Sequence, residues 1–150
     1  MTSEEYWLNF LQKKGLPQST PYGGELGFDT MSENSTELLA LILCGKKTAF
    51  FSALPAFEID AEPLPKIGLY YVLCDSLDQP KGIIKTENVS ILPYSAVTWE
   101  MAKKEGEDSS MLEWTARRDE FFEDDADFMG YDFGPNMPVV FEEFRLQSFE

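Results

Sequence analysis

Two adjacent lysines, Lys46 and Lys47, follow an apolar run and Gly45, and the hydroxyl-bearing Thr48 comes directly after them. Two neighbouring cations at the point where a helix gives way to a strand are well placed to bind an anionic ligand. Each ammonium group can bind a phosphate or polarise a carbonyl. Lysines after a helix also commonly face only the negative end of its dipole in solvent, so this alternative stays open for the segment taken alone.

The elements that would position these lysines can be predicted from the flanking residues. The apolar run 38–43 predicts a helix buried on most sides, with Asn34 as its N-cap and Glu37 completing a capping box. Gly45 fits the left-handed conformation that ends a helix. Residues 48–52 are β-branched, aromatic or small and predict a strand. The lysines therefore lie between a predicted helix and a predicted strand.

The composition excludes several kinds of chemistry. The chain of 150 residues has no histidine and only two cysteines, without CxxC spacing. A zinc site would lack ligands, and no mechanism with a histidine base is available. Cys44 and Cys74 are expected to be small apolar core residues. We expect neither a metal nor a cofactor.

The net charge of −15 restricts the partners that the chain can bind. Nonspecific binding of long nucleic acid is disfavoured by repulsion, whereas a nucleoside, a nucleotide or a short RNA needs only a local positive site. No apolar run approaches the roughly 18 residues that a membrane-spanning helix requires. The first residues, 1–5, lack the pattern of a signal peptide, so a cytoplasmic location and no membrane partner are expected.

The remaining pattern predicts one α+β domain over residues 1–150. Tyr6, Trp7, Phe10 and Leu11 have helical spacing, and Thr2 or Ser3 can cap a helix over 3–14. Strands are expected over 69–74, 81–86, 89–92 and 139–149, further helices over 98–105 and 110–123, and loops or irregular segments over 17–31, 54–65 and the acidic stretch within 119–127. These elements predict a small, mostly antiparallel and partly closed β-barrel flanked by helices.

Six segments carry a family resemblance. In chain order they are Gly45-Lys46-Lys47-Thr48-Ala49, residues 63–68, residues 80–89, Ala102-Lys103-Lys104-Glu105-Gly106-Glu107, the stretch from Trp114 to Phe122, and residues 137–144. Together they resemble the ASCH domain family, in its longer subgroup. The resemblance covers nearly the whole chain, with the helix 3–14 packing on the ASCH-like domain.

The resemblance implies a PUA-like β-barrel with helices around one cleft, and a role in binding RNA or nucleotides. Some members are similar to amidohydrolases that act on acetylated cytidine, and some to ribonucleases. The small amidohydrolases use a lysine in a G-x-K motif, a threonine three residues further on and a glutamate at the end of a helix. In this sequence the lysine matches Lys47 and the glutamate matches Glu105, whereas the threonine position is occupied by Phe50. Because alternate residues share one strand face, Thr48 or Ser52 is the candidate hydroxyl. Arg118 stands where longer members often carry a histidine.

Three functions follow as hypotheses. In a binding module, Lys46, Lys47 and Arg118 would contact phosphate, and an aromatic side chain would stack on a base. The candidates for stacking are Trp7, Tyr22 and Phe133, although each is also a natural core residue.

In an amidohydrolase acting on a modified nucleoside, Lys47 would activate the nucleophile, Glu105 would carry the proton, and Thr48 or Ser52 would supply the hydroxyl. A lysine base needs its pKa lowered from about 10.4 to about 7–8, whereas a charged lysine binds phosphate without any shift. Binding therefore ranks above catalysis. The third hypothesis is a protein partner with a basic surface that meets the acidic stretch 119–127.

Overall fold

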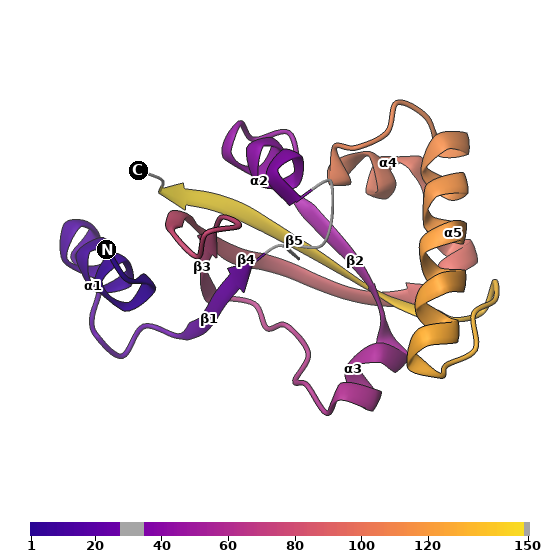
Figure 1. Ribbon diagram of the computed structural model, residues 1–150, viewed down its shortest axis with the longest axis horizontal. Helices are drawn as coiled ribbons and strands as arrows, with labels where there is room; N and C mark the ends of the chain where they lie inside the picture. The colour runs from indigo at the N-terminus through magenta and orange to yellow at the C-terminus, as the bar shows by residue number, and fades with distance from the viewer. Residues whose placement is uncertain (28–34, 149–150) are drawn as a thin grey trace.

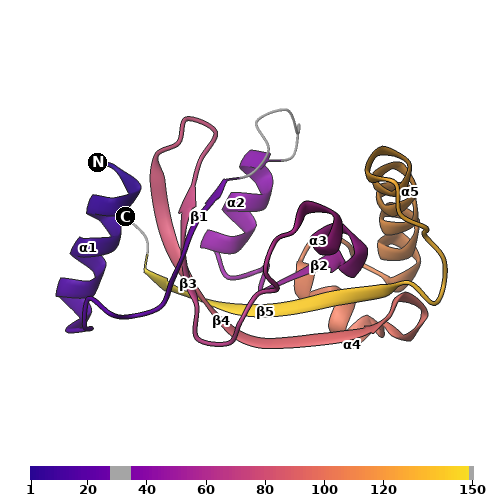
Figure 2. The ribbon, with the colours of Figure 1, turned by 90° about the horizontal axis from the view of Figure 1, so that it is seen from below.

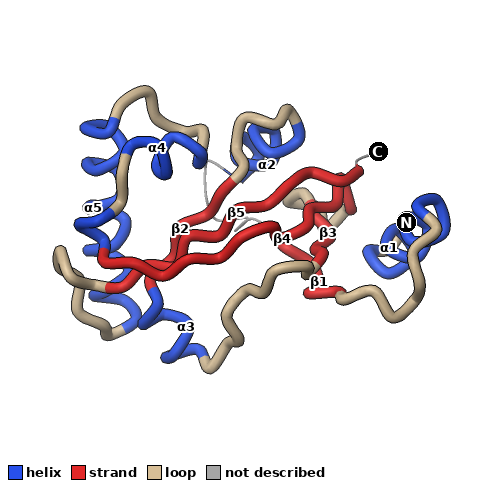
Figure 3. The backbone as a smooth tube through the Cα atoms, turned by 180° about the vertical axis from the view of Figure 1, so that it is seen from behind, coloured by secondary structure: helices blue, strands red, loops and turns tan. Residues whose placement is uncertain are grey.

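The computed structural model describes residues 1–27 and 35–148. Its elements, in chain order, are α1 (Ser3–Lys14), β1 (Tyr22–Gly27), α2 (Ser35–Leu43), β2 (Ala49–Ala53), α3 (Leu54–Asp60), β3 (Tyr70–Cys74), β4 (Pro80–Pro93), the 3-10 turn η1 (Tyr94–Ala96), α4 (Trp99–Ala102), the 3-10 turn η2 (Lys103–Glu105), α5 (Met111–Met129) and β5 (Pro138–Ser148). Figure 1 shows α1 and α5 at opposite ends of the sheet, and Figure 3 shows the same arrangement from behind.

The described strands form one sheet in the order β1-β3-β4-β5-β2. All pairs are antiparallel except β1 with β3, which is parallel. The predicted α+β class, with a mostly antiparallel sheet flanked by helices, is confirmed. Within the described residues, β1 and β2 are the two edge strands and do not pair with each other. The predicted partly closed barrel is therefore an open, twisted sheet. Figure 2 shows β4 and β5 running along its length.

Three apolar clusters hold the helices on this sheet. Trp7, Phe10 and Leu11 of α1 pack on β3 and the start of β4. Leu39 and Ile42 of α2 pack on the other face of these strands. The third cluster joins α4 and α5 to β2 and β5, and its members include Phe51, Trp114, Phe122 and Phe141. None of the described helices is both long and apolar enough to cross a membrane.

Two predicted helix boundaries agree with the structure. Thr2 caps α1, since its side chain accepts from the Glu5 amide and Glu5 accepts in return from the Thr2 amide. Gly45 has a left-handed conformation after α2. Asn34, the predicted N-cap of that helix, lies outside the described residues. The helix is also less buried than predicted, and Cys44, expected in the core, is exposed, with its thiol directed at the Leu41 carbonyl.

Several strand predictions were wrong in detail. The glycine-rich segment 22–27, predicted as part of a loop, is strand β1, because it pairs with β3. The two predicted strands 81–86 and 89–92 are one strand, β4, and the expected break coincides with a bulge between Thr86 and Asn88. A bulge bends a strand without ending it.

Two helix predictions were also wrong. Residues 54–60 form helix α3 rather than an irregular segment, because a proline is compatible with the first helical turn. The acidic stretch expected as a loop belongs to α5, which continues to Met129. Trp114, Arg118, Phe122 and Ala126 are buried at a spacing of four, and this stripe extends the helix through the acidic residues.

Candidate functional site

Lys47 is brought to Glu105 by the end of α2. The Leu41 carbonyl accepts from the amides of both Lys46 and Lys47, which closes the helix and turns the chain toward β2. The Lys47 side chain is only 3% exposed. Its Nζ lies 3.0 Å from Glu107 Oε2 and 3.6 Å from Glu105 Oε2. The two residues singled out in the sequence therefore meet in the interior.

Glu105 is a fully buried acceptor for several donors. Its Oε1 accepts from Trp114 Nε1 at 2.8 Å, from Arg118 Nε at 3.0 Å and from Arg117 Nη2 at 3.1 Å. Its Oε2 accepts from Arg118 Nη2 and, at 3.3 Å, from the amide of Phe51 in the edge strand β2. Because Trp114 and Arg118 are one helical turn apart on α5, a single helix face supplies two of these donors.

A second layer of carboxylates neutralises the remaining charge. Arg117 Nε and Nη2 bind Asp108 Oδ2 at 3.0 and 2.8 Å, and Arg117 Nη1 lies 3.5 Å from Glu107 Oε1. We call this group the Glu105 cluster; its members are Lys47, Glu105, Glu107, Asp108, Trp114, Arg117 and Arg118. Its three cations and three carboxylates give no net charge, so it differs from an open anion-binding site.

The electrostatics of Glu105 follow from its neighbours. Burial alone would raise the pKa of this carboxyl, but the charges of Arg118, Lys47 and Arg117 outweigh burial and hold the pKa at about 2. The group is thus ionised at neutral pH. A carboxylate of this kind orients the cations around it, and it has no proton to donate.

This shift predicts a pH dependence of stability. A carboxyl whose folded-state pKa lies below its unfolded value of 4.5 stabilises the fold above that value, and the contribution is lost as the pH falls toward 2. Between about pH 6 and about pH 3 we expect the loss from Glu105 to be about 2 kcal/mol. Urea denaturation of the wild type and of Glu105→Gln at several pH values measures this loss. The difference in free energy of unfolding between the two proteins should shrink as the pH falls from about 6 to about 3. A difference that stays constant with pH would contradict the assignment.

Thr48 connects the cluster to the surface. Its amide donates to the Lys104 carbonyl at 2.8 Å, and its hydroxyl donates to the same carbonyl at 3.4 Å. Thr48 and Lys104 also line a hollow of about 450 Å³, which we call the Thr48 groove. Its lining residues are Gly45, Thr48, Glu87, Asn88, Lys104, Glu143, Phe144, Arg145 and Leu146. This volume falls in the range of small-ligand sites.

The other hydroxyl and stacking candidates lie elsewhere. Ser52 is opposite Val140 of β5, on the same strand face as Phe50. Phe50, at the family threonine position, packs on Phe144 and lies under the Lys47 ammonium, 5.1 Å from Nζ to the ring centroid.

The aromatic candidates belong to two separate clusters. The Trp7 and Tyr22 rings stack on each other at 4.7 Å where α1 meets β1. Phe133 packs on Tyr94 and Phe122 beside α5. The structure thus brings together Lys47, Glu105 and Arg118, with Thr48 adjacent and Lys46 exposed, but it does not bring Trp7, Tyr22 or Phe133 to them.

Sequence reasoning missed several residues of the site. Glu107, Asp108 and Arg117 belong to the Glu105 cluster. Glu107 and Arg117 lie within segments that carry the family resemblance, but no role was predicted for them, and Asp108 is marked only by its proximity to Glu105. Glu142 of β5 was missed as well. It is half-buried, and its Oε2 accepts from the Thr86 hydroxyl at 2.7 Å. Burial raises the pKa of this carboxyl, and the hydrogen bond from Thr86 only partly opposes that change.

Comparison with known proteins gives a consistent family. The family model of the ASCH domain matches residues 26–148. A crystal structure of a protein from Enterococcus faecalis is 32% identical, with a TM-score of 0.84 over 97% of this chain and 88% of that chain. The ASCH domain from Lactobacillus crispatus is 25% identical, with a TM-score of 0.81 over 97% and 95% of the two chains. No curated protein matches the chain.

Proposed function

Because the chain belongs to the ASCH domain family, we propose that it binds a small nucleotide- or RNA-related ligand in the Thr48 groove. The observation that carries the proposal is the groove itself. It is a hollow of about 450 Å³ beside the Lys47–Glu105 pair, and its lining combines apolar surface with two cations and several hydrogen-bonding groups.

The side chains of the rim suit a ligand with one phosphate and a polar ring. Lys104 is paired with Glu143, and Arg145 Nε lies 3.6 Å from Glu87 Oε1. A phosphate can take over either cation, and the carboxylate that it releases can then accept from an amino group of a base. Asn88 and Thr48 add uncharged donors and acceptors.

The balance of charge limits the size of the ligand. The groove has two basic and two acidic side chains, in a chain with a net charge of −15. A long polyanion would gain little at the rim and would be repelled by the rest of the surface. A mononucleotide or a very short RNA pays a much smaller repulsion.

The geometry favours binding over amide hydrolysis. Glu105 carries no proton at neutral pH, Lys47 is 3% exposed, and Phe50 offers no hydroxyl. In this proposal the Glu105 cluster fixes two residues that reach the groove. Thr48 directly follows Lys47 in the chain, and Lys104 directly precedes Glu105.

Calorimetric titration with cytidine monophosphate, cytidine and a short RNA tests the proposal. Lys104→Gln should lower nucleotide affinity about fivefold, because one exposed phosphate contact is lost. Affinity should also fall as salt rises from about 50 to about 300 mM, because exposed ion pairs are screened. An N4-acetylated cytidine in the same panel, followed by chromatography, detects hydrolysis directly.

Lys103→Gln is the matched control for this test. Lys103 is the neighbouring residue and is also exposed, but it pairs with Glu100 and does not line the groove. An equal loss of affinity in both variants would mean that only the general surface charge matters. The absence of any heat with all three probes would reject the proposed function.

A further inference from the structure

The outer face of α5 exposes two phenylalanines at one end of the molecule. Phe128 is 89% exposed and Phe121 is 48% exposed. They are seven residues apart, or about two helical turns, so they lie on the same side of the helix. Figure 1 shows that α5 lies at the end of the sheet opposite α1. Because phenylalanine is one of the side chains most often buried, this pair marks a candidate contact surface.

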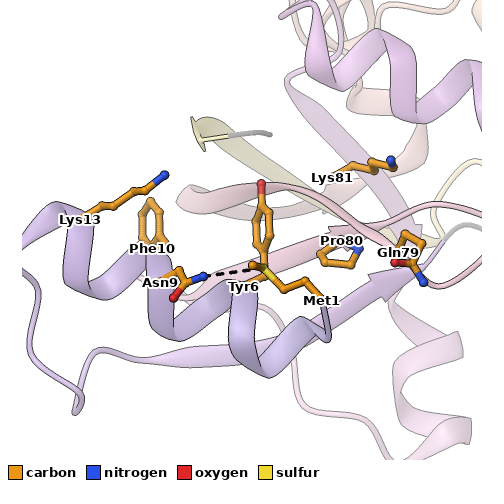
Figure 4. A pocket seen from close by; sticks show the side chains of 8 residues that line it. All are labelled: Met1, Tyr6, Asn9, Phe10, Lys13, Gln79, Pro80 and Lys81. Atoms are coloured by element: carbon orange, nitrogen blue, oxygen red, sulfur yellow. Dashed lines mark hydrogen bonds between the residues drawn. The ribbon is translucent and has the colours of Figure 1, made fainter.

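The aromatic side chains of α1, at the other end of the sheet, provide a contrast. Phe10 is 5% exposed and packs on Tyr70, with the ring centroids 5.8 Å apart. Figure 4 shows Tyr6 and Phe10 of α1, together with Pro80 of β4, around a hollow of about 320 Å³. These rings therefore face other parts of the chain. Phe128, in contrast, makes no ring contact with any described residue.

Three exposed carboxylates surround these two rings. Glu120 and Asp127 each directly precede one of the phenylalanines, and Asp124 lies one helical turn from both. None of the three carboxylates has an ion pair or a hydrogen-bond partner among the residues that the structure describes. We call this surface the α5 face; its members are Glu120, Phe121, Asp124, Asp127 and Phe128.

The other charged groups of this part of the helix are engaged within the fold. Both arginines of α5 bind Glu105, and Asp119 and Asp125 each accept from a tyrosine hydroxyl at 2.6 Å. Arg118 also lies 5.3 Å from the centroid of the Phe121 ring, but its side chain is only 10% exposed. The α5 face thus has three negative charges, and the helix supplies no exposed cation to balance them.

We propose that the α5 face binds a basic segment of a partner protein, in which lysines or arginines flank an apolar side chain. Charge complementarity selects this partner, because the unpaired carboxylates attract its cations while its apolar side chain lies against Phe121 and Phe128. An arginine of the partner can also stack on an exposed ring. RNA and anionic phospholipid surfaces are disfavoured by repulsion, and so is a second copy of this chain, with its net charge of −15.

Fluorescence anisotropy with the full chain tests this surface with two labelled peptides. One has lysines and leucines at helical spacing, and the other has the same charge with serine in place of leucine. We expect the leucine peptide to bind about tenfold more tightly, because only its side chains cover the two rings. Phe128→Ala should remove most of this advantage. Asp124→Asn should lower the affinity for both peptides about threefold, because one exposed ion pair is lost.

Leu112→Ala and Glu123→Gln are the matched controls. Leu112 is 82% exposed and Glu123 is an exposed carboxylate, and both lie on a different side of α5 from Phe128. A loss with Leu112→Ala equal to that with Phe128→Ala, or with Glu123→Gln equal to that with Asp124→Asn, would overturn the proposal. Binding would then follow the general hydrophobicity or charge of the surface. Equal affinity of the leucine and serine peptides for the wild type would likewise overturn it.

Discussion

Replacing Glu105 by glutamine is expected to lower the free energy of unfolding by about 3–5 kcal/mol, the usual cost of removing one partner from a buried ion network. The carboxylate of Glu105 accepts from Arg117, Arg118, Trp114 and the Phe51 amide, and it lies beside Lys47. Glutamine keeps the shape but leaves three cations with two carboxylates. Its amide group also presents a donor where the native residue presents only acceptors.

Two other glutamates provide matched controls for this substitution. Glu107 is part of the same cluster but is partly exposed, at 16%, so Glu107→Gln should cost about 1 kcal/mol or less. Glu142 has only the Thr86 hydroxyl as a hydrogen-bond partner among the described residues, and burial raises its pKa. A buried acid with a raised pKa opposes folding once the pH exceeds its unfolded-state value, so Glu142→Gln should keep or raise stability at neutral pH.

Urea denaturation of the three variants at pH 7 separates these effects. The same change of side chain should give a large loss at Glu105, a small loss at Glu107 and no loss at Glu142. Equal losses at Glu105 and Glu107 would contradict the central role of Glu105. A large loss of stability in Glu142→Gln would contradict the raised pKa. It would mean that groups other than the Thr86 hydroxyl stabilise the charged form of Glu142.

The meeting of Lys47 with Glu105 could be predicted from the sequence, but their environment could not. The family resemblance placed both residues in one site, and both are found in one cluster. The sequence does not show that two arginines of α5 reach the same carboxylate, since this depends on how α5 packs across β2. Burial of Lys47 likewise results from tertiary packing, and a lysine after a helix is ordinarily exposed.

The elements that were missed are those that depend on distant partners. Segment 22–27 has three glycines and a low intrinsic strand preference, and it becomes a strand because β3 offers an edge. In α5 the acidic residues obscured a buried stripe of period four. Two of them, Asp119 and Asp125, also accept from the hydroxyls of Tyr94 and Tyr131, so they anchor the flanking segments. Local composition contains neither kind of information.

The second large effect is expected at Gly106, which lies between Glu105 and Glu107. Its backbone is left-handed, with φ of 72°, and a Cβ atom there would lie 2.5 Å from the Lys46 carbonyl oxygen and 2.9 Å from its carbon. Both of these are backbone atoms, which cannot rotate away as a side chain would. Gly106→Ala must therefore separate the η2 turn from the Lys46–Lys47 segment, and we expect a loss of about 2–5 kcal/mol.

Gly130→Ala separates the two causes of that loss. Gly130 also has a left-handed backbone, with φ of 90°, but a Cβ atom there would meet nothing within 4 Å. It should lose only the conformational cost, about 1–2 kcal/mol. Gly106 lies against the backbone of Lys46 and Lys47, whereas Gly130 does not. Gly106→Ala should therefore also shift the amide NMR signals of Thr48 and Lys104, and Gly130→Ala should not. Equal losses of stability, with no shift at Thr48, would show that the close approach of the two segments does not hold the groove in place.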